Sequence, residues 1–217
     1  ISFCKNDIEK FKPDLIIYID YPGFNMRIAK WAKSKNYINH FYISPKVWVW
    51  KEKRVEQIKK VIDKMYVILP FEEDFYKKKH NYKVDFVGHP LLDAIESENT
   101  FNKNDFLLVN NLSEKPIIAL LPGSRNQEIN KLLPVMLEAV SNLTGYQLVI
   151  AGAPSKNVEY YEEIIQSSDS NTNNIKVISN QTYNILRVST AAIVNSGTAT
   201  LETALFNIPQ VVCYKTS

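Results

Sequence analysis

The sequence predicts an α/β protein with two domains, each built around a parallel sheet. Short apolar runs of strand length alternate with segments of helical pattern, which is the order expected for strand-helix-strand units in parallel sheets. This rhythm is interrupted between Ser97 and Lys115, where the chain is polar and rich in Asn. We therefore place the domain boundary within that stretch.

Composition narrows the class of protein. The chain has 217 residues, of which 45% are hydrophobic and 23% charged, as is ordinary for a folded globular protein. Its net charge of +3 suits an anionic ligand or an acidic membrane surface but is too small for a typical nucleic-acid binder. Cys4 and Cys213 lie far apart and have no metal-binding spacing, which indicates a reducing compartment. No apolar run reaches the ~20 residues of a membrane-spanning helix.

The first domain is predicted over residues 1–100. A helical pattern precedes the first strand, and Pro22 and Gly23 mark the turn that follows it. The expected strands are Asp14–Asp20, Ile38–Ser44, Met65–Leu69 and Val84–Gly88, and the expected helices are Asn25–Lys35, Lys51–Asp63 and Phe71–Lys79. Because the chain opens without Met inside a helical pattern, we expect the first strands of this domain to be missing.

Residues 101–115 are interpreted as a linker, and the second domain is predicted over residues 116–217. Pro122 and Gly123 break its first strand, and the Ala, Leu and Glu content of TATLETAL favours a helix. The expected strands are Ile117–Pro122, Gln147–Gly152, Ile175–Ser179, Ala191–Asn195 and Gln210–Tyr214, and the expected helices are Gln127–Asn142, Val158–Ser168 and Thr198–Phe206. The chain stops just after a strand, so the C-terminal part of this domain is expected to be missing. Ligands of parallel sheets bind at the carboxyl ends of the strands, which places the expected chemistry in a cleft between the domains.

The stretch IDYPGFN contains a candidate general base. Asp20 ends a strand, and a partly buried carboxyl group at such a position suits proton transfer because burial raises its pKa. The alternative is a turn acid that binds its own backbone. Asn25 is expected to cap the following helix.

Two further strand ends carry aromatic or titratable residues. In YISPKVWVWKEKR, Trp48 and Trp50 alternate with Val residues and have basic flanks, which fits a platform for a sugar ring or lipid, or else a buried loop. In VDFVGHPLLD, His89 lies at a strand-to-helix turn, where it either faces a ligand or makes a structural hydrogen bond.

The stretch LLPGSRNQEI predicts an anion site. Ser124 is expected to cap a helix, and Arg125 is expected in the first helical turn, where a cation opposes the helix dipole. A phosphate ligand or a salt bridge to Glu128 would compensate that charge, and we favour the phosphate.

The stretch VNSGTATLETAL predicts a second anion site. Ser196, Gly197 and Thr198 form a strand-to-helix turn that directs backbone N–H groups at one point, and Glu202 lies on the same helix face as Thr198. The alternative is that Ser196 or Thr198 is only an N-cap and Glu202 a solvated acid.

Five stretches together carry a family resemblance: KPDLIIYIDYPGFN, YISPKVWVWKEKRV, FVGHPLLD, LLPGSRNQEI and SGTATLE. In this order and spacing they resemble the lipid-A-disaccharide synthases, which form glycosyltransferase family 19. The resemblance extends from about Lys12 to about Tyr214. It implies the GT-B fold, in which two Rossmann-like domains face a cleft.

The resemblance also implies an activity. Such enzymes use no metal or other cofactor and transfer 2,3-diacylglucosamine from UDP-2,3-diacylglucosamine to the 6-hydroxyl of 2,3-diacylglucosamine 1-phosphate, with inversion and release of UDP. They act at the cytoplasmic face of the inner membrane of Gram-negative bacteria. The implied partners are these two substrates and the membrane surface, and nucleic acid is not among them.

By the same resemblance, Asp20 is the base that deprotonates the acceptor, and Arg125 neutralises charge on the leaving UDP. The Ser196-Gly197-Thr198 turn holds the diphosphate and Glu202 binds the ribose. The other expected substrate-binding residues are Gly123, Ser124, Asn25, His89 and Trp48. The family's Gly-rich N-terminal loop and its last helices are expected outside this chain, so the chain alone is expected to be inactive.

Two other interpretations remain open at this stage. A UDP-N-acetylglucosamine 2-epimerase would share the architecture and a UDP pocket, but the SPKVWVWKEKR motif has no role in such an isomerase. A non-catalytic nucleotide- or lipid-binding remnant would be a protein of a different class. An intact upstream Gly-rich loop would favour the transferase.

Overall fold

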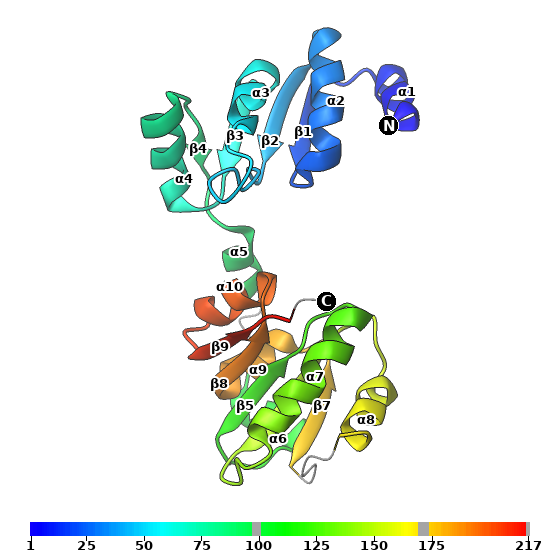
Figure 1. Cartoon of the computed structure of the whole chain (residues 1–217), viewed down its shortest axis with the longest axis vertical. Coiled ribbons are helices and arrows are strands. Elements are labelled where there is room, and N and C mark those ends of the chain that lie inside the picture. The colour runs from blue at the N-terminus through cyan, green and yellow to red at the C-terminus, as the bar shows by residue number, and fades with distance from the viewer. Residues whose placement is uncertain (97–100, 169–173, 216–217) are drawn as a thin grey trace. The chain divides into compact units, whose positions relative to one another are not determined.

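The computed structural model describes residues 1–96, 101–168 and 174–215. The chain divides into two compact units, Ile1–Asp93 and Ala94–Ser217 (Figure 1). Each unit has its own parallel sheet and its own hydrophobic core. They are described separately below.

The first unit has a four-stranded sheet in the order β1-β2-β3-β4. Its strands are β1 (Leu15–Ile19), β2 (Ile38–Tyr42), β3 (Lys64–Val67) and β4 (Asp85–Phe86), all parallel. Its helices are α1 (Ser2–Phe11), α2 (Pro22–Ser34), α3 (Arg54–Val61) and α4 (Pro70–Asp74), which continues as the π-helical turn η1 (Phe75–Lys79). Phe41 and Met65 from the strands pack with Ile28, Ile58 and Tyr76 from the helices to form the core.

The second unit has a five-stranded sheet in the order β7-β6-β5-β8-β9. Its strands are β5 (Ile117–Leu121), β6 (Gln147–Gly152), β7 (Ile175–Ser179), β8 (Ser189–Asn195) and β9 (Gln210–Cys213), all parallel. Its helices are α6 (Lys103–Val109), α7 (Asn126–Val140), α8 (Val158–Gln166), α9 (Thr182–Val188) and α10 (Thr198–Leu205), while α5 (Pro90–Glu96) spans the junction between the units.

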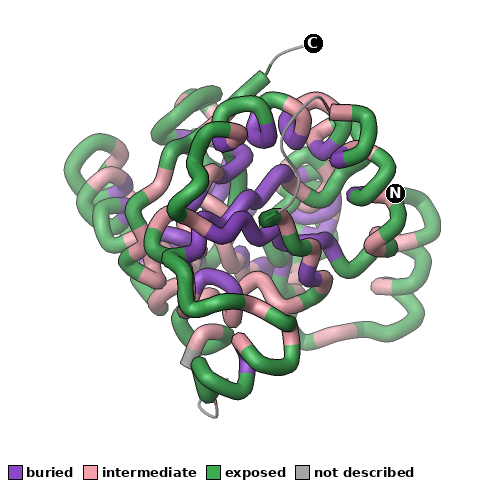
Figure 2. Tube along the Cα trace, turned by 90° about the horizontal axis from the view of Figure 1, so that it is seen from below, coloured by how far each residue is buried: buried purple, intermediate pink, exposed green. Residues whose placement is uncertain are grey.

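The core of the second unit has two layers, one on each face of its sheet. Leu120 packs with residues of α7 and α8 on one face, and Ala119 packs with residues of α6 and α9 on the other. In Figure 2 the buried positions lie in the interior of the fold and the exposed positions on its outer segments. Every residue of β5 and β6 is buried, and apart from Gln147 both strands consist of apolar residues and Gly152, as expected in the middle of a parallel sheet.

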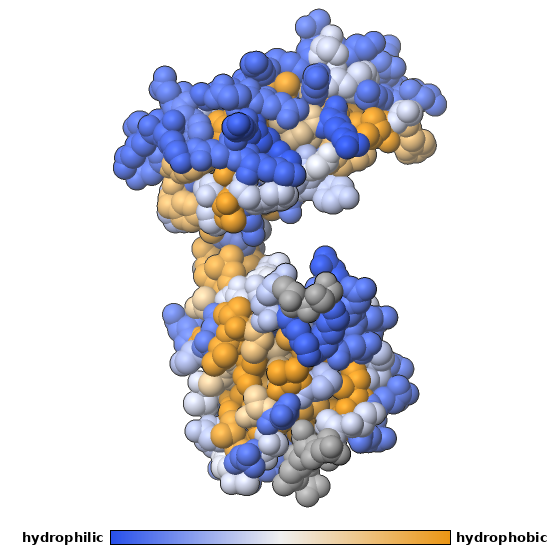
Figure 3. Space-filling view, viewed as in Figure 1, coloured by the Kyte–Doolittle hydropathy of each residue, from blue (hydrophilic) through white to orange (hydrophobic). Residues whose placement is uncertain are grey.

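The edge strands are less covered. On the face seen in Figure 3, hydrophobic residues gather over the β9 edge of the second sheet, where Val211 and Val212 are 63% and 51% exposed. In the first unit, Leu15, Ile17 and Ile19 on one side of β1 are exposed, whereas Tyr18 on the other side is buried. In the described part of the chain, no helix is both long enough and apolar enough to cross a membrane.

The α/β class, the parallel sheets and every expected strand are confirmed, with ends that differ by a few residues. The linker predicted over 101–115 is wrong, because this stretch forms α6, whose Phe106 is buried in the core of the second unit. The division after Asp93 precedes the predicted boundary at residue 100, and residues 97–100 lie outside the described part of the chain. Helix α9 was not among the expected elements.

Candidate functional site

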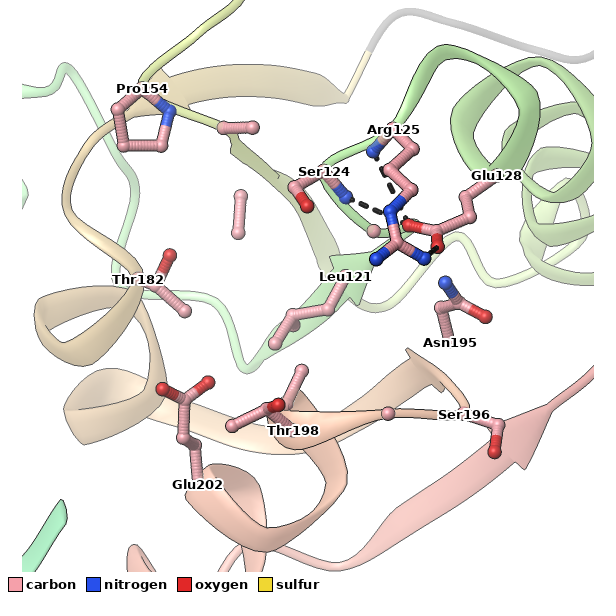
Figure 4. A pocket seen from close by; sticks show the side chains of 15 residues that line it. Leu121, Ser124, Arg125, Glu128, Pro154, Thr182, Asn195, Ser196, Thr198 and Glu202 are labelled. Atoms are coloured by element: carbon pink, nitrogen blue, oxygen red, sulfur yellow. Dashed lines mark hydrogen bonds and ion pairs between the residues drawn. The ribbon is translucent and has the colours of Figure 1, made fainter. Parts of the chain in front are cut away.

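A pocket of about 380 Å³ lies at the carboxyl end of the second sheet (Figure 4). Its walls come from the turn between β5 and α7, the turn between β8 and α10, and the segment after β6. Seven predicted site residues line it together: Gly123, Ser124, Arg125, Ser196, Gly197, Thr198 and Glu202. The structure thus brings the two predicted anion-binding turns into one site.

Gly123 in the β5–α7 turn is required by its surroundings. Its φ of +105° is a conformation that residues with a side chain rarely adopt. A Cβ at this position would lie 2.5 Å from Oε2 of Glu128 and 2.6 Å from Nδ2 of Asn195. The backbone therefore passes closely under these two side chains at the pocket wall.

The N-terminus of α7 is capped by Glu128. Its Oε2 accepts hydrogen bonds from the backbone N–H groups of Ser124 (3.2 Å) and Arg125 (3.3 Å). The expectation that Ser124 caps this helix with its side chain is wrong, because Arg125 is the N-cap residue and Glu128 supplies the oxygen. A carboxylate at this position also interacts favourably with the helix dipole.

Arg125 lies just before the first helical turn rather than within it. Its Nη1 is 3.2 Å from Oε1 of Glu128, so the salt bridge considered as an alternative is formed in this structure. The Arg125 side chain is 83% exposed, and ion pairs at such sites contribute little to stability. The guanidinium can therefore leave Glu128 for a stronger anion in the pocket.

The β8–α10 turn follows a buried strand end. The N–H of Ser196 donates to the carbonyl of Cys213 in β9, and Gly197 is the N-cap of α10 in an extended conformation. Because Gly197 occupies the N-cap position and makes no side-chain capping hydrogen bond, the alternative that Ser196 or Thr198 serves as the N-cap is wrong. In Figure 4, Ser196 lies at the outer end of the turn, apart from Thr198 and Glu202.

Glu202 is held by a residue that sequence reasoning missed. Its Oε1 accepts a hydrogen bond from the hydroxyl of Tyr183 on α9 at 3.1 Å. Thr198 and Glu202 lie side by side on one wall of the pocket, across from Arg125 (Figure 4). Glu202 is thus not simply a solvated acid, and the unpredicted helix α9 explains why its partner was not found.

In the first unit, Asp20 directly follows β1 at the carboxyl edge of the sheet. Asp20 and Tyr21 both have left-handed backbone conformations, with φ of 44° and 43°, which is unusual for two consecutive residues with side chains. Asp20 is exposed, so the partial burial expected for it is not observed in this structure.

Asn25 stabilises this turn in an unexpected way. Helix α2 begins at Pro22, so Asn25 lies in its first turn, and the expectation that Asn25 caps the helix is wrong. Instead its Nδ2 donates to the carbonyl of Ile19 (3.1 Å) and to that of Asp20 (2.7 Å). These bonds fix the backbone that carries the Asp20 carboxylate.

His89 makes the structural hydrogen bond that was one of its two interpretations. Its Nδ1 accepts from the N–H of Leu91 at 3.2 Å, at the start of α5. Partial burial, and next the nearby Lys46 ammonium, lower the pKa of the imidazole. Both effects favour the neutral ring, which this acceptor role requires.

Trp48 and Trp50 differ in their surroundings. The Trp48 indole donates from Nε1 to Oε1 of Glu72 at 3.3 Å and packs edge-on against Phe71, with ring centroids 4.9 Å apart. Trp50 is 59% exposed, and the Lys51 ammonium lies 4.2 Å from its ring centroid. The segment is therefore not the buried loop considered as an alternative, although Val47 within it is buried.

Glu72 is a second residue that sequence reasoning missed. It is 2% exposed, and its Oε2 accepts from the N–H groups of Ile68 (3.2 Å) and Leu69 (3.0 Å) at the start of α4. Burial raises the pKa of its carboxyl group, although these hydrogen bonds and that from Trp48 act in the opposite direction. The signal that could have revealed it is Pro70 in the first helical position followed by an acid two residues later.

The raised pKa of Glu72 predicts a pH-dependent stability difference for the Glu72→Gln variant. A carboxyl group whose pKa is higher in the folded state stabilises the fold most below its ordinary pKa of 4.5, and this contribution is lost as the pH rises through the folded-state value. Gln does not titrate, so the free energy of unfolding of the parent relative to the variant should fall as the pH rises from 4.5.

Urea denaturation at several pH values, followed by Trp fluorescence, measures this difference. All three tryptophans lie in the first unit, so the fluorescence change reports on the unit that contains Glu72. A difference between parent and variant that stays constant with pH, or grows as the pH rises, would contradict the expectation.

The described part of the chain contains no cluster of metal ligands. Across residues 1–96, 101–168 and 174–215, no group of three or more His, Cys, Asp or Glu side chains is arranged to hold a metal ion. The charged groups that line the pocket of the second unit are Arg125, Glu128 and Glu202.

Comparison with known sequences identifies clear relatives. The family model described as lipid-A-disaccharide synthetase matches residues 3–217. A lipid-A-disaccharide synthase from Syntrophus aciditrophicus is 40% identical over 218 residues, which cover 98% of this chain and 56% of that protein. The enzyme of the same name from Coxiella burnetii is 40% identical over 97% of this chain and 55% of its own length. This chain therefore spans about half the length of the curated relatives it matches.

Comparison with solved structures identifies the fold. A UDP-N-acetylglucosamine 2-epimerase from Neisseria meningitidis, solved with UDP-N-acetylglucosamine, superposes with a TM-score of 0.68 at 16% identity, covering 100% of this chain and 63% of that one. A protein from Listeria monocytogenes described as a putative enzyme of the same kind also gives a TM-score of 0.68, at 14% identity, covering 100% of this chain and 61% of that one. The shared fold is of the GT-B type, with two Rossmann-like domains.

Proposed function

Because this chain belongs to the lipid-A-disaccharide synthetase family, we propose that the full-length protein transfers 2,3-diacylglucosamine from UDP-2,3-diacylglucosamine to 2,3-diacylglucosamine 1-phosphate. The observation that carries the proposal is the pocket of the second unit, which gathers an arginine, two helix N-termini and an acid at the carboxyl end of a parallel sheet. Such an arrangement suits the diphosphate and ribose of a UDP-sugar.

In this proposal the second unit binds the donor. The backbone of the Ser196-Gly197-Thr198 turn approaches the diphosphate, and the N-terminus of α10 directs its dipole at the negative charge. The Arg125 guanidinium leaves its ion pair with Glu128 and binds a phosphate oxygen instead. Glu128 continues to cap α7. Glu202, oriented by Tyr183, accepts hydrogen bonds from the ribose hydroxyls.

The first unit supplies the base. Asp20 takes the proton from the 6-hydroxyl of the acceptor, and the resulting oxygen attacks C1 of the donor sugar from the face opposite the UDP. As the new bond forms, the bond between C1 and the diphosphate oxygen breaks, and its electron pair leaves with UDP. Attack on the opposite face inverts the anomeric centre. Asn25 keeps the Asp20 turn in place throughout.

Charge stabilisation in this step comes from the protein itself. UDP leaves with about two negative charges, and preorganised donors that face developing charge provide a large share of the rate enhancement in many enzymes. Arg125 and the N-terminus of α10 are the groups that line the pocket and can play this part, because Glu128 already caps α7. The exposed guanidinium has room to follow the departing phosphate.

Replacement by Ala is expected to affect stability at one glycine of the pocket and UDP binding at the other. Gly123→Ala should lower the melting temperature, because the added Cβ meets Glu128 and Asn195 at a positive φ. Gly197→Ala should leave the melting temperature nearly unchanged, because Gly197 is extended and nothing lies within 4 Å of the added Cβ, but it should weaken UDP binding by filling the space next to the diphosphate.

Differential scanning fluorimetry and UDP titration calorimetry on the full-length protein measure both effects. Gly145→Ala is the matched control, because its added Cβ also meets nothing within 4 Å and Gly145 does not line the pocket. Unchanged UDP affinity in the Gly197→Ala variant would place the diphosphate away from this turn.

We also propose that the protein acts at the cytoplasmic face of the inner membrane. Val49 and Trp50 are 60% and 59% exposed next to Lys51, Lys53 and Arg54, and exposed aromatic residues with basic flanks suit an anionic lipid surface. The double substitution Val49→Ser and Trp50→Ser should reduce sedimentation with vesicles that contain phosphatidylglycerol, and added salt should reduce it further.

Leu108→Ser is the control for this experiment, since Leu108 is 77% exposed on α6 in the other unit. Equal loss of vesicle binding in both variants would indicate general hydrophobic adhesion. Undiminished binding in the double variant would remove this segment from the membrane contact.

The epimerase interpretation has weaker support. The two solved structures described as epimerases share the fold but are only 14% and 16% identical to this chain in sequence. The lipid-A-disaccharide synthase from Syntrophus aciditrophicus is 40% identical. Proton NMR of the protein with UDP-N-acetylglucosamine separates the two, because only an epimerase would invert C2 of the sugar. The proposal predicts an unchanged spectrum.

A further inference from the structure

The buried carboxylate of Glu72 has no part in the mechanism above, although it is among the most enclosed polar groups of the first unit. It is 2% exposed, and both of its oxygens are used. Oε2 accepts from two backbone N–H groups at the start of α4, and Oε1 accepts from the Trp48 indole. A buried acid is costly unless it is fully hydrogen-bonded, so its position is closely defined.

Trp48 lies in a segment that needs such an anchor. Residues 43–53 connect β2 to α3 and contain no helix or strand. The buried side chain of Val47 and the hydrogen bond between Ser44 and Tyr76 hold the first part of the segment. For Trp48 itself, the bond to Glu72 and the edge-on contact with Phe71 fix the plane of the ring.

The ring is fixed at the edge of the sheet where chemistry is expected. In the order β1-β2-β3, Asp20 follows β1, the Trp48 segment follows β2, and Glu72 follows β3. In a parallel sheet all three positions lie at the carboxyl edge. Trp48 is 36% exposed, so part of its apolar surface remains available after both contacts are made.

We infer that Glu72 is a positioning residue: it fixes the Trp48 indole so that the exposed part of the ring packs against the sugar or the first acyl carbons of the lipid acceptor. This inference rests on the proposed function, because it assumes a lipid-linked sugar at the edge that carries Asp20. Glu72 itself touches no substrate and acts through Trp48 alone. A carboxylate suits the task better than an amide, because it accepts all three hydrogen bonds without a competing donor.

A double-mutant cycle on the full-length protein tests the inference. The variants are Glu72→Gln, Trp48→Phe, which keeps an aromatic ring but removes the Nε1 donor, and the combination of the two. Asp74→Asn is the matched control, because Asp74 is an exposed acid of the same helix that pairs with Lys78 at the surface. Initial rates of disaccharide formation give kcat and the KM for the acceptor.

We expect Glu72→Gln to raise the acceptor KM by about fivefold or more, the effect of one lost hydrogen bond, with kcat changed less than twofold. The same substitution should have no further effect in the Trp48→Phe background, and Asp74→Asn should behave as the parent. An equal rise in KM in both backgrounds, or no rise at all, would overturn the inference.

A second readout does not depend on activity. Protein labelled with 5-fluorotryptophan gives one ¹⁹F resonance for each of the three tryptophans, and the Trp48→Phe variant identifies that of Trp48. Glu72→Gln should shift or broaden the Trp48 resonance, and the resonance of Trp31 should stay in place as a check on folding. An unchanged Trp48 resonance would refute the positioning role. A parent protein that forms no disaccharide would instead refute the proposed function, together with the substrate part of this inference.

Discussion

Replacement of Asp20 by Asn is expected to lower kcat by about 10²- to 10⁴-fold, the contribution typical of a positioned general base. The amide cannot accept the proton of the acceptor hydroxyl, whereas the acceptor should still bind. Asn tolerates the left-handed conformation that Asp20 adopts, with φ of 44°, so the turn and its two hydrogen bonds from Asn25 should persist. Disaccharide formation at saturating substrate concentrations measures the loss.

Asp14→Asn is the control for this substitution. Asp14 is also an exposed acid next to β1, but it precedes the strand and lies at the opposite edge of the sheet. Its replacement should leave kcat within a factor of about two, since surface substitutions away from a site have small effects. An Asp20→Asn variant that retains the kcat of the Asp14→Asn variant would show that another group accepts the proton.

Replacement of Arg125 by Ala is expected to lower kcat by about 10²- to 10³-fold, the usual loss for one donor that stabilises developing charge. The melting temperature should not change measurably, because the pair with Glu128 is at the surface and the cap of α7 comes from the glutamate rather than the arginine. Steady-state kinetics and thermal denaturation of the same preparation separate the two effects.

Lys176→Ala provides the comparison, because Lys176 is an exposed cation of β7 in the same unit but does not line the pocket. It should be indistinguishable from the parent in both measurements. An Arg125→Ala variant with nearly parental turnover would mean that Arg125 only pairs with Glu128, as it does in this structure.

The sequence predicted the strands well because their signal is local. Two strands, Ile117–Leu121 and Gln147–Gly152, are runs of consecutive buried residues. A run of this kind is buried on all sides only in a central parallel strand or in a buried helix, and these runs are too short for a helix. The turn after Ile117–Leu121 was found because Pro122 restricts the backbone and Gly123 can adopt the positive φ that a tight turn needs. The β8 turn was found in the same local way, from an apolar run that ends at Ser196-Gly197 before a helical pattern, and residues of both turns line one pocket.

Helix α6 was missed because its polar residues gave a linker-like composition. Lys103, Asn104 and Asp105 are exposed, and Phe106 is the residue of this helix that is buried in the core. One buried side chain in seven residues produces no detectable periodicity. The cap supplied by Asn102, whose side chain accepts from Asn104 and Asp105, was the available signal.

The errors at the site concern which polar side chain binds which backbone group. Whether Ser124 or Glu128 caps α7 depends on the path of the backbone through Gly123, and a sequence pattern does not contain that path. The partners Tyr183 and Trp48 reach Glu202 and Glu72 from elements 19 and 24 residues away. Such pairs depend on tertiary structure, so local patterns could identify the acids but not their roles.

The mass of the lipid product is the most direct test of the central claim. Full-length protein is incubated with UDP-2,3-diacylglucosamine and 2,3-diacylglucosamine 1-phosphate, and the lipid extract is analysed by mass spectrometry while UDP is quantified by chromatography. The proposal predicts a tetraacylated disaccharide monophosphate in equal amount to the UDP released. Folded protein that binds UDP but forms no disaccharide from these two substrates would contradict it.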